Sequence, residues 1–371
     1  MKNIIITDSS LRDGNHSVKH TISLDSIEKY CQFADRAGIS IVEVGHGNGL
    51  SASSLLIGKS PNTDKEMLTI ARKNLKTSKL GIHTIPGLST IDDAKLAMDY
   101  GVDVFRVATH CTEATLSKSH IEALAKTNKE VYGVLMMSAL ITAEELAEQA
   151  KIMEDYGAQA IIIMDSTGTY LPHDVKERIS LLKSKLNIKV GFHAHNNLGC
   201  AIANSLIAVE SGAELIDACI RGFGAGAGNA PLELILPVLE KTGYTTGISF
   251  EETIKEADRV MDYLVPSAPI TTPINVLTGL TRLFSGFEKP IVKASKLYGI
   301  EYSSLIFELG NRKLVAGQED LILEVAQKLK ENRWKILITG GNGYIAKSIY
   351  SALCKKHDVT LVTKNDLNLT Y

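Results

Sequence analysis

Short apolar segments rich in isoleucine and valine alternate along the chain with longer segments whose apolar residues recur at helical spacing. The short segments predict β-strands at residues 4–7, 41–45, 80–85, 104–108, 131–136, 160–164, 190–193 and 215–219. The longer segments predict helices, which include residues 26–37, 66–75, 91–100 and 144–156. Strands that alternate with helices are typical of a parallel sheet built from crossover units.

The number of repeats sets the fold class, which is α/β. Eight strand–helix units over about 240 residues match the size of a closed (β/α)8 TIM barrel. An open, doubly wound sheet is the alternative, but the eight repeats and the polar residues at the strand ends favour the barrel. Active sites of such barrels lie at the carboxyl ends of the strands. We therefore expect the chemistry of this chain at that rim.

Polar residues and glycines do gather where the predicted strands end. The segments "LRDGNH", "GHGNG", "RVATHCTE", "MDSTG", "HAHNN" and "GAGAGNAP" follow six of the eight strands. Arg12, Asp13 and His16 lie after the first strand. The other rim positions supply candidates for substrate binding, which are His46, Asn48, Ser166 and Asn229.

Composition narrows the class of protein. The 371 residues are 44% hydrophobic, with a net charge of −2, as expected of a soluble globular protein without a nucleic-acid-binding or membrane-binding surface. No twenty-residue apolar span or export signal is present. The five cysteines show no metal-type spacing, so we expect reduced thiols and a cytoplasmic location.

The sharpest local pattern is a pair of histidines two positions apart. On a strand, His193 and His195 point to the same side and can share one divalent ion. Asp13, at the end of the first strand, can supply an oxygen ligand. An isolated pair of histidines at this spacing is about as often a hydrogen-bonded structural pair as a metal site. These residues alone do not choose among Mn²⁺, Mg²⁺, Zn²⁺ and Fe²⁺. Of these ions and Co²⁺, Mn²⁺ is the one that we expect.

These motifs resemble those of a known family. "SLRDGNH", "EVGHGNGL", "RVATHCTEA", "LMMS", "HAHNN", "GAGAGNAPLE" and "AGQED" occur in the order found in the 4-hydroxy-2-oxovalerate aldolases, which are related to HMG-CoA lyase. The resemblance covers about residues 3–330. It implies a divalent-metal-dependent class II aldolase. Such an enzyme cleaves a 4-hydroxy-2-oxoacid to pyruvate and an aldehyde, or forms the 4-hydroxy-2-oxoacid from these two compounds.

The resemblance also implies roles for individual residues. Asp13, His193 and His195 would be the metal ligands, Arg12 would stand beside the substrate oxygen, and His16 would be the acid/base. Tyr298, in "LYGIE", would reach the site from the helical segment after the barrel.

The chain departs from the family pattern at Asn48, where aspartate is usual, and in "GIHTIPG", which contains His83. These departures put acetaldehyde in doubt as the aldehyde product.

Beyond the barrel, expected at residues 1–245, two further segments are predicted. Residues 246–331 read as a helical domain that packs on the barrel, and the resemblance implies that it docks an aldehyde dehydrogenase. Residues 332–371 read as strand, glycine loop, helix and strand, with Gly340 and Gly343 spaced as in NAD-dependent epimerase/dehydratases. We expect a truncated Rossmann-like segment that does not bind NAD(H) productively, because one βαβ unit lacks the crevice for a dinucleotide.

Two other functions remain open at this point. An acyl-CoA-dependent condensing enzyme or lyase of the same superfamily would share the metal site and differ in its need for CoA. A non-catalytic scaffold for an epimerase module would not retain the rim residues, and their presence argues against it. Self-association into a homo-oligomer is also left open.

Overall fold

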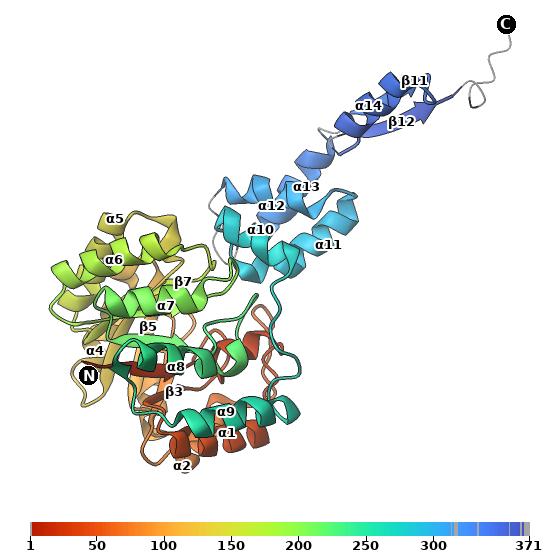
Figure 1. The fold of residues 1–371 in the computed structure, drawn as a ribbon. Coiled ribbons are helices and arrows are strands. Elements are labelled where there is room, and N and C mark those ends of the chain that lie inside the picture. Colours follow the sequence, from red (N-terminus) through yellow and green to blue (C-terminus); the bar gives the residue numbers. More distant parts are fainter. Residues whose placement is uncertain are drawn as a thin grey trace, which may run out of the picture. The chain divides into compact units, whose positions relative to one another are not determined.

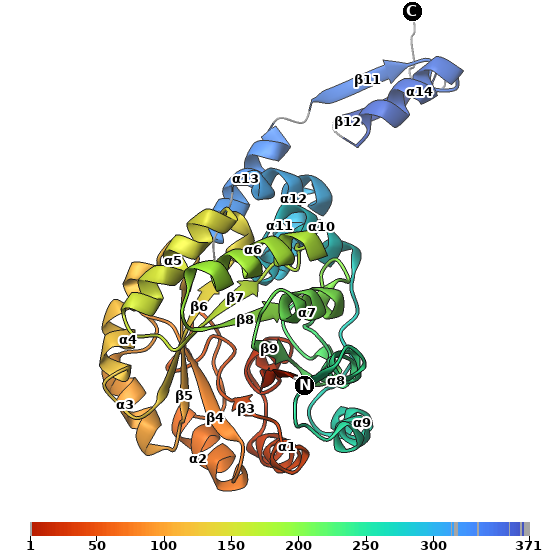
Figure 2. The ribbon, with the colours of Figure 1, turned by 60° about the vertical axis from the view of Figure 1, so that its left-hand side comes forward.

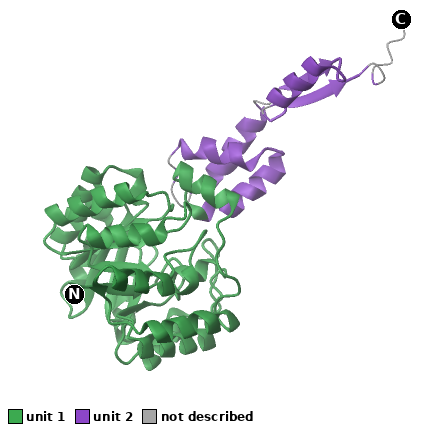
Figure 3. Ribbon diagram, in the orientation of Figure 1, with its two compact units in different colours: residues 1–285 green, residues 286–371 purple. Residues whose placement is uncertain are grey.

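The computed structural model describes residues 2–312, 314, 318–331, 334–355, 357–363 and 366. The chain forms two compact units, residues 1–285 and residues 286–371 (Figure 3). No helix among the described residues has the length and apolar character needed to cross a membrane.

Eight parallel strands of the first unit close into a barrel, because the first strand pairs with both the second and the last (Figure 2). The strands are β2 (Ile5–Asp8), β3 (Ile41–Glu43), β4 (Lys79–Thr84), β5 (Val104–His110), β6 (Glu130–Met136), β7 (Ala160–Asp165), β8 (Lys189–Ala194) and β9 (Leu215–Ala218). The predicted TIM barrel is thus confirmed, and each predicted strand is present with small shifts at its ends. A separate short parallel pair joins β1 (Lys2–Asn3) to β10 (Tyr244–Thr245).

A ring of helices covers the outside of the barrel (Figure 1). These are α1 (Leu24–Ala37), α2 (Asp64–Asn74), α3 (Ile91–Asp99), α4 (Lys118–Leu124), α5 (Ala143–Asp155), α6 (Pro172–Lys185), α7 (Ala201–Glu210) and α8 (Leu232–Lys241). Reciprocal side-chain caps start three of them, with Thr63, Thr90 and Thr142 each accepting a hydrogen bond from the backbone three residues on. The four helices predicted by residue range are confirmed.

The inside of the barrel is built in layers, since alternate residues of each strand point inward. One layer is apolar and contains Ile41, Val104, Tyr132, Ala160 and Leu215. The next layer lies two residues further along three of these strands, and there the inward residues are charged: Glu43, Arg106 and Asp217. All three are buried. The change from apolar to charged marks the approach to the carboxyl-end rim.

Several elements follow the barrel strands. Helix α9 (Phe250–Arg259) packs on α1 and α8, and Ala257 and Val260 belong to the main hydrophobic core. The first unit also contains α10 (Pro273–Thr281). The expected domain limits at residues 245 and 331 stay predictions.

The second unit contains α11 (Glu288–Tyr298), α12 (Tyr302–Gly310) and α13 (Asp320–Glu331). Its last part is a βαβ element in which β11 (Lys335–Thr339) and β12 (Asp358–Val362) pair in parallel beside α14 (Tyr344–Leu353). The strand–loop–helix–strand order predicted for this segment is present.

Candidate metal centre and active site

A tight turn after β2 brings the first group of site residues to the rim. The Asp8 carboxylate accepts hydrogen bonds from the Ser10 backbone N–H at 2.8 Å and from the Ser10 hydroxyl, which fixes the chain as it leaves the strand. A 3₁₀ helix, η1 (Asp13–His16), follows directly. Side chains three residues apart in a 3₁₀ helix lie on the same side. Asp13 and His16 therefore share one face of this turn.

The structure brings Asp13, His193 and His195 together as a buried cluster. The Nε2 atoms of the two histidines are 3.3 Å apart, and each lies 3.9 Å from Asp13 Oδ2. Ligand atoms at about 2.0–2.2 Å from one divalent ion are themselves roughly 3 to 3.5 Å apart. The three atoms therefore fit a single divalent ion after a small inward movement of Asp13.

The electrostatics of the cluster suit a cation. Burial opposes the ionisation of Asp13, but Arg12 and the histidines outweigh it and hold the pKa of Asp13 well below its ordinary value. Burial lowers the pKa of His195 to about 4, although Asp13 opposes this shift. At neutral pH, Asp13 is thus a carboxylate and His195 a neutral imidazole, which are the forms that bind a metal.

Arg12 lies beside this cluster and contacts two carboxylates. Its Nη1 donates to Asp13 Oδ1 at 2.7 Å and its Nε donates to Glu43 Oε2 at 2.8 Å. Its Nη2 is buried and has no hydrogen-bond partner among the described residues. A buried donor of this kind is costly unless a ligand completes it. Arg12 therefore has a donor left over for a ligand, and its predicted place beside a substrate oxygen stays a prediction.

His16 is partly buried at the same rim. Burial lowers its pKa to about 4, with the Asp13 carboxylate acting in the opposite direction. Its ring packs against Gly47, where an added Cβ would lie 2.7 Å from the imidazole. The ring is thus neutral near pH 7 and able to accept a proton.

The predicted substrate-binding residues occupy different surroundings. Both ring nitrogens of His46 contact the backbone of the loop that follows β3. Nε2 lies 3.0 Å from the Gly58 carbonyl oxygen, and Nδ1 accepts a hydrogen bond from the Asn48 N–H at 3.1 Å. Asn48 itself is half-buried. The roles predicted for these two residues stay predictions.

Ser166 and Asn229 are both buried. The Ser166 hydroxyl accepts the Met137 N–H at 2.9 Å. Asn229 joins the metal cluster, with Nδ2 2.8 Å from His193 Nε2 and an Oδ1 that has no hydrogen-bond partner in the described part of the chain. Gly224 makes room for it, because a Cβ there would lie 1.4 Å from that Oδ1. Their predicted contact with substrate stays a prediction.

Three predicted residues belong to the second unit. Tyr298 is the last residue of α11, and its role at the site stays a prediction. Gly340 has φ of +73° in the loop after β11, and Gly343 caps the start of α14. The cofactor-loop role predicted for these two glycines and the expected lack of productive NAD binding both stay predictions.

Sequence reasoning missed the charged layer of Glu43, Arg106 and Asp217. Asp217 Oδ2 lies 2.9 Å from His193 Nδ1, and Arg106 Nη1 lies 3.3 Å from Glu43 Oε2. The signal that could have revealed them is a charged residue inside a short apolar strand, at a position that points inward. His83, the departure noted above, also faces this layer, with its Nδ1 3.4 Å from Glu43 Oε1.

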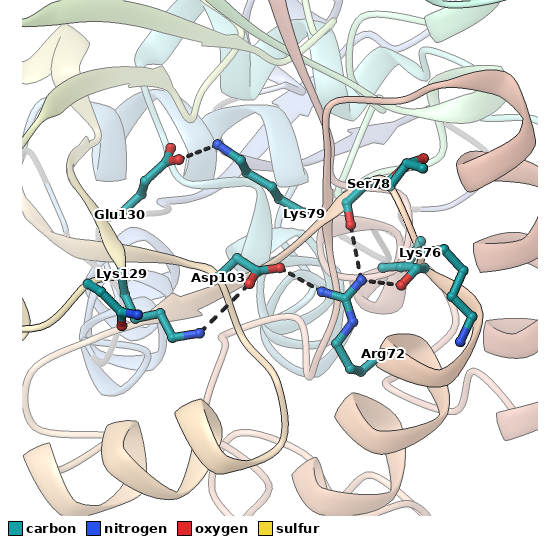
Figure 4. Close-up of a pocket in the computed structure, with 10 residues that line it drawn as sticks. Arg72, Lys76, Ser78, Lys79, Asp103, Lys129 and Glu130 are labelled. Carbon is teal, nitrogen blue, oxygen red and sulfur yellow. Dashed lines mark hydrogen bonds and ion pairs between the residues drawn. The ribbon is translucent and has the colours of Figure 1, made fainter.

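A cavity of about 570 Å³ lies at the amino-terminal end of the barrel strands, and Figure 4 shows its lining. Arg72 donates to Asp103 at 2.7 Å and also reaches the Ser78 carbonyl, while Lys79 pairs with Glu130. None of the predicted site residues lines this cavity. Ion pairs at this end of a TIM barrel commonly serve stability, so the rim cluster remains the candidate site.

A closed parallel barrel with an Asp–His–His cluster at its carboxyl-end rim defines the class of metal-dependent TIM-barrel enzymes. The HMGL-like family matches residues 3–260, and the DmpG-like communication domain matches residues 269–331. The chain therefore belongs to the HMGL-like family and, within it, to the 4-hydroxy-2-oxovalerate aldolase family. The resemblance noted in the motifs is confirmed.

Individual relatives support this assignment. A 4-hydroxy-2-oxovalerate aldolase of Spirochaeta aurantia is 53% identical over 328 residues, which cover 88% of this chain and 96% of the relative. The enzyme of the same name from Pectobacterium atrosepticum is 50% identical, with 88% and 96% covered. The carboxyl transferase domain of Rhizobium etli pyruvate carboxylase superposes with a TM-score of 0.73 at 18% identity, covering 90% of this chain and 62% of that one. This last likeness concerns the fold alone.

Proposed function

We propose that this chain is a carbon–carbon lyase that converts a 4-hydroxy-2-oxoacid to pyruvate and an aldehyde, and catalyses the reverse condensation. The observation that carries this proposal is the convergence of Asp13, His193 and His195 beside Arg12 at the barrel mouth. Relatives about half identical over most of their length bear the name of this activity. The CoA-dependent alternative has no such support among these relatives.

The metal ligands would be Asp13, His193 and His195, and the ion that we favour is Mn²⁺. A divalent ion bound there would act as a Lewis acid toward the 2-oxo oxygen, where negative charge develops. The unpartnered Nη2 of Arg12 would donate a hydrogen bond to the same part of the substrate. Because Arg12 already contacts Glu43 and Asp13, its position is fixed before the substrate arrives.

His16 would move the proton. It accepts the proton of the C4 hydroxyl as the C3–C4 bond breaks, and the electron pair of that bond passes to the 2-oxo group to form the pyruvate enolate. Protonation at C3 then gives pyruvate. A histidine that is neutral near pH 7 is suited to begin this step as the base.

The communication domain suggests a macromolecular partner. Its match at residues 269–331 supports docking of an aldehyde dehydrogenase that consumes the aldehyde product. The proposed partners are therefore a small 2-oxoacid, an aldehyde and this second enzyme.

A pyruvate-release assay tests the proposed function. The purified chain would be mixed with a series of 4-hydroxy-2-oxoacids that differ at C5, with Mn²⁺ added or with EDTA. We expect metal-dependent pyruvate formation from at least one of them without CoA. No pyruvate from any member of the series, or an absolute need for CoA, would overturn the proposal.

A further inference from the structure

The charged layer inside the barrel is organised around one side chain. Arg106 is fully buried, and its guanidinium lies between two carboxylates. Its Nη1 is 3.3 Å from Glu43 Oε2, and its Nη2 donates to Asp217 Oδ2. A single cation thus joins β3 to β9 across the interior of the barrel.

Each of these two carboxylates also holds a residue of the proposed site. Glu43 Oε2 accepts a hydrogen bond from Arg12 Nε at 2.8 Å. Asp217 Oδ2 lies 2.9 Å from His193 Nδ1. In the described part of the chain Arg106 forms no hydrogen bond to Arg12 or His193, so it acts on both through the two acids.

Stability alone does not account for this arrangement. The interior of a TIM barrel is ordinarily filled by branched apolar side chains, and the layer below the charged one is of that kind. Replacing buried ion pairs by apolar residues of similar volume is often neutral or stabilising. A barrel that keeps three buried charges in one layer therefore keeps them for another reason.

We propose that Arg106 is a positioning residue that sets the orientation of both the metal-binding His193 and the substrate-facing Arg12. With Arg106 in place, its guanidinium holds Glu43 against Arg12 on one side and Asp217 against His193 on the other. Without it, the two carboxylates repel each other and are free to turn away. This inference rests on the proposed function and adds a residue to the same site.

Arginine suits this position because of its shape. The planar guanidinium presents donors on two sides, and each can serve a different carboxylate. Lysine carries the same charge on one nitrogen and lacks the two separate donor nitrogens that serve the two carboxylates in Arg106. Arg106→Lys therefore preserves the net charge of the layer but breaks the link between its two acids.

The test measures Mn²⁺ affinity in the absence of substrate, by electron paramagnetic resonance of free Mn²⁺, together with kcat and KM. Loss of a residue that orients a metal ligand typically costs about 10–100-fold in metal affinity or activity. We expect both the Mn²⁺ affinity and the kcat of Arg106→Lys to fall within that range. The matched control is Arg72→Lys, since Arg72 also bridges an acid and backbone carbonyls but lies at the other end of the barrel. We expect its Mn²⁺ affinity and kcat to be unchanged.

Coupling between residues separates positioning from a general loss of stability. In an Asp217→Asn background, Arg106→Lys should change Mn²⁺ affinity by less than about threefold, because the path to His193 is already broken. In a Glu43→Gln background, its full effect on Mn²⁺ affinity should remain. If Arg106→Lys does not fold, the single variants carry the test. Asp217→Asn should then chiefly weaken Mn²⁺ binding, and Glu43→Gln should chiefly lower kcat.

Two results would overturn the proposal. One is a folded Arg106→Lys protein whose Mn²⁺ affinity and kcat match those of the wild type. The other is an equal effect of Arg106→Lys in all three backgrounds. A wild-type protein that binds no Mn²⁺ and releases no pyruvate would instead overturn the proposed function.

Discussion

Asp217 accepts a hydrogen bond from His193, with 2.9 Å between Asp217 Oδ2 and His193 Nδ1. Because Nδ1 carries the proton in this arrangement, Nε2 keeps its lone pair, and this atom lies 2.8 Å from Asn229 Nδ2, 3.3 Å from His195 Nε2 and 3.9 Å from Asp13 Oδ2. A carboxylate behind a histidine is the usual way in which proteins fix the tautomer of a metal ligand. This contact connects the interior of the barrel with the chemistry at its rim.

Removing the two histidines should remove the metal. In His193→Ala/His195→Ala, only Asp13 of the three proposed ligands remains, and one carboxylate does not hold a divalent ion tightly. We expect about one ion per wild-type chain and none per variant chain after Mn²⁺ loading and desalting, as measured by atomic emission. His173→Ala is the control, since that side chain is 77% exposed on α6. Equal metal content in the double variant and the control would rule out this site.

Loss of Arg12 should affect turnover more than metal binding. Arg12→Ala removes the unpartnered donor beside the cluster, and the loss of one such donor costs about 10²–10³ in kcat in well-studied enzymes. We expect a decrease of that size while Mn²⁺ still binds. Steady-state kinetics and Mn²⁺ titration on the same preparation check this. A variant with near-normal kcat would show that the chemistry occurs elsewhere.

A methyl group at Gly224 should disturb the metal cluster. Its Cβ would lie 1.4 Å from Asn229 Oδ1 and 2.9 Å from Asp13 Oδ2, so both side chains must move. We expect Gly224→Ala to bind Mn²⁺ at least about tenfold more weakly, because the methyl group displaces both the proposed ligand Asp13 and its neighbour Asn229. Gly243→Ala is the control. Gly243 has φ of +88° and nothing within 4 Å, so its substitution should cost about 1 kcal/mol of stability and leave Mn²⁺ binding intact.

The alternation of strands and helices was sufficient to predict the barrel, because each unit carries its own local pattern. The meeting of Asp13, His193 and His195 was also predictable, since the two histidines are two residues apart and Asp13 follows a strand end. The Glu43–Arg106–Asp217 layer was not. It depends on side chains from β3, β5 and β9 that meet across the barrel interior, and no local pattern encodes that meeting. The sequence shows one charged residue within each of these apolar strands, but it does not show which charged residue of another strand is its partner.

Asp8 should make the protein less stable as the pH rises. Burial raises the pKa of Asp8 to about 6, against 3.8 ordinarily, although hydrogen bonds from Ser10 and Tyr30 oppose the shift. The folded state then binds more protons than the unfolded state between these two values, so the free energy of unfolding falls with increasing pH across this range. The contribution reaches about 3 kcal/mol and is constant above roughly pH 7.

The comparison with Asp8→Asn isolates this contribution. Urea unfolding of both proteins from pH 4 to pH 8 gives the difference between their free energies of unfolding. Relative to the variant, the wild type should lose stability between about pH 4 and pH 6. A difference that is independent of pH would show that Asp8 has its ordinary pKa in the folded protein.

Deleting residues 334–371 should leave the aldolase reaction intact. The family models match residues 3–260 and 269–331, and no described residue of this segment belongs to the barrel core. Large apolar side chains of the βαβ element stay in contact with water, among them Trp334 at 70% exposed and Tyr344 at 87%.

One such unit does not provide both walls of a dinucleotide site. We expect kcat/KM for pyruvate release within about twofold of the full chain, and calorimetry of the full chain should detect no tight NADH binding. A dissociation constant for NADH in the low micromolar range would contradict the second expectation, and a tenfold loss of kcat/KM on deletion would contradict the first.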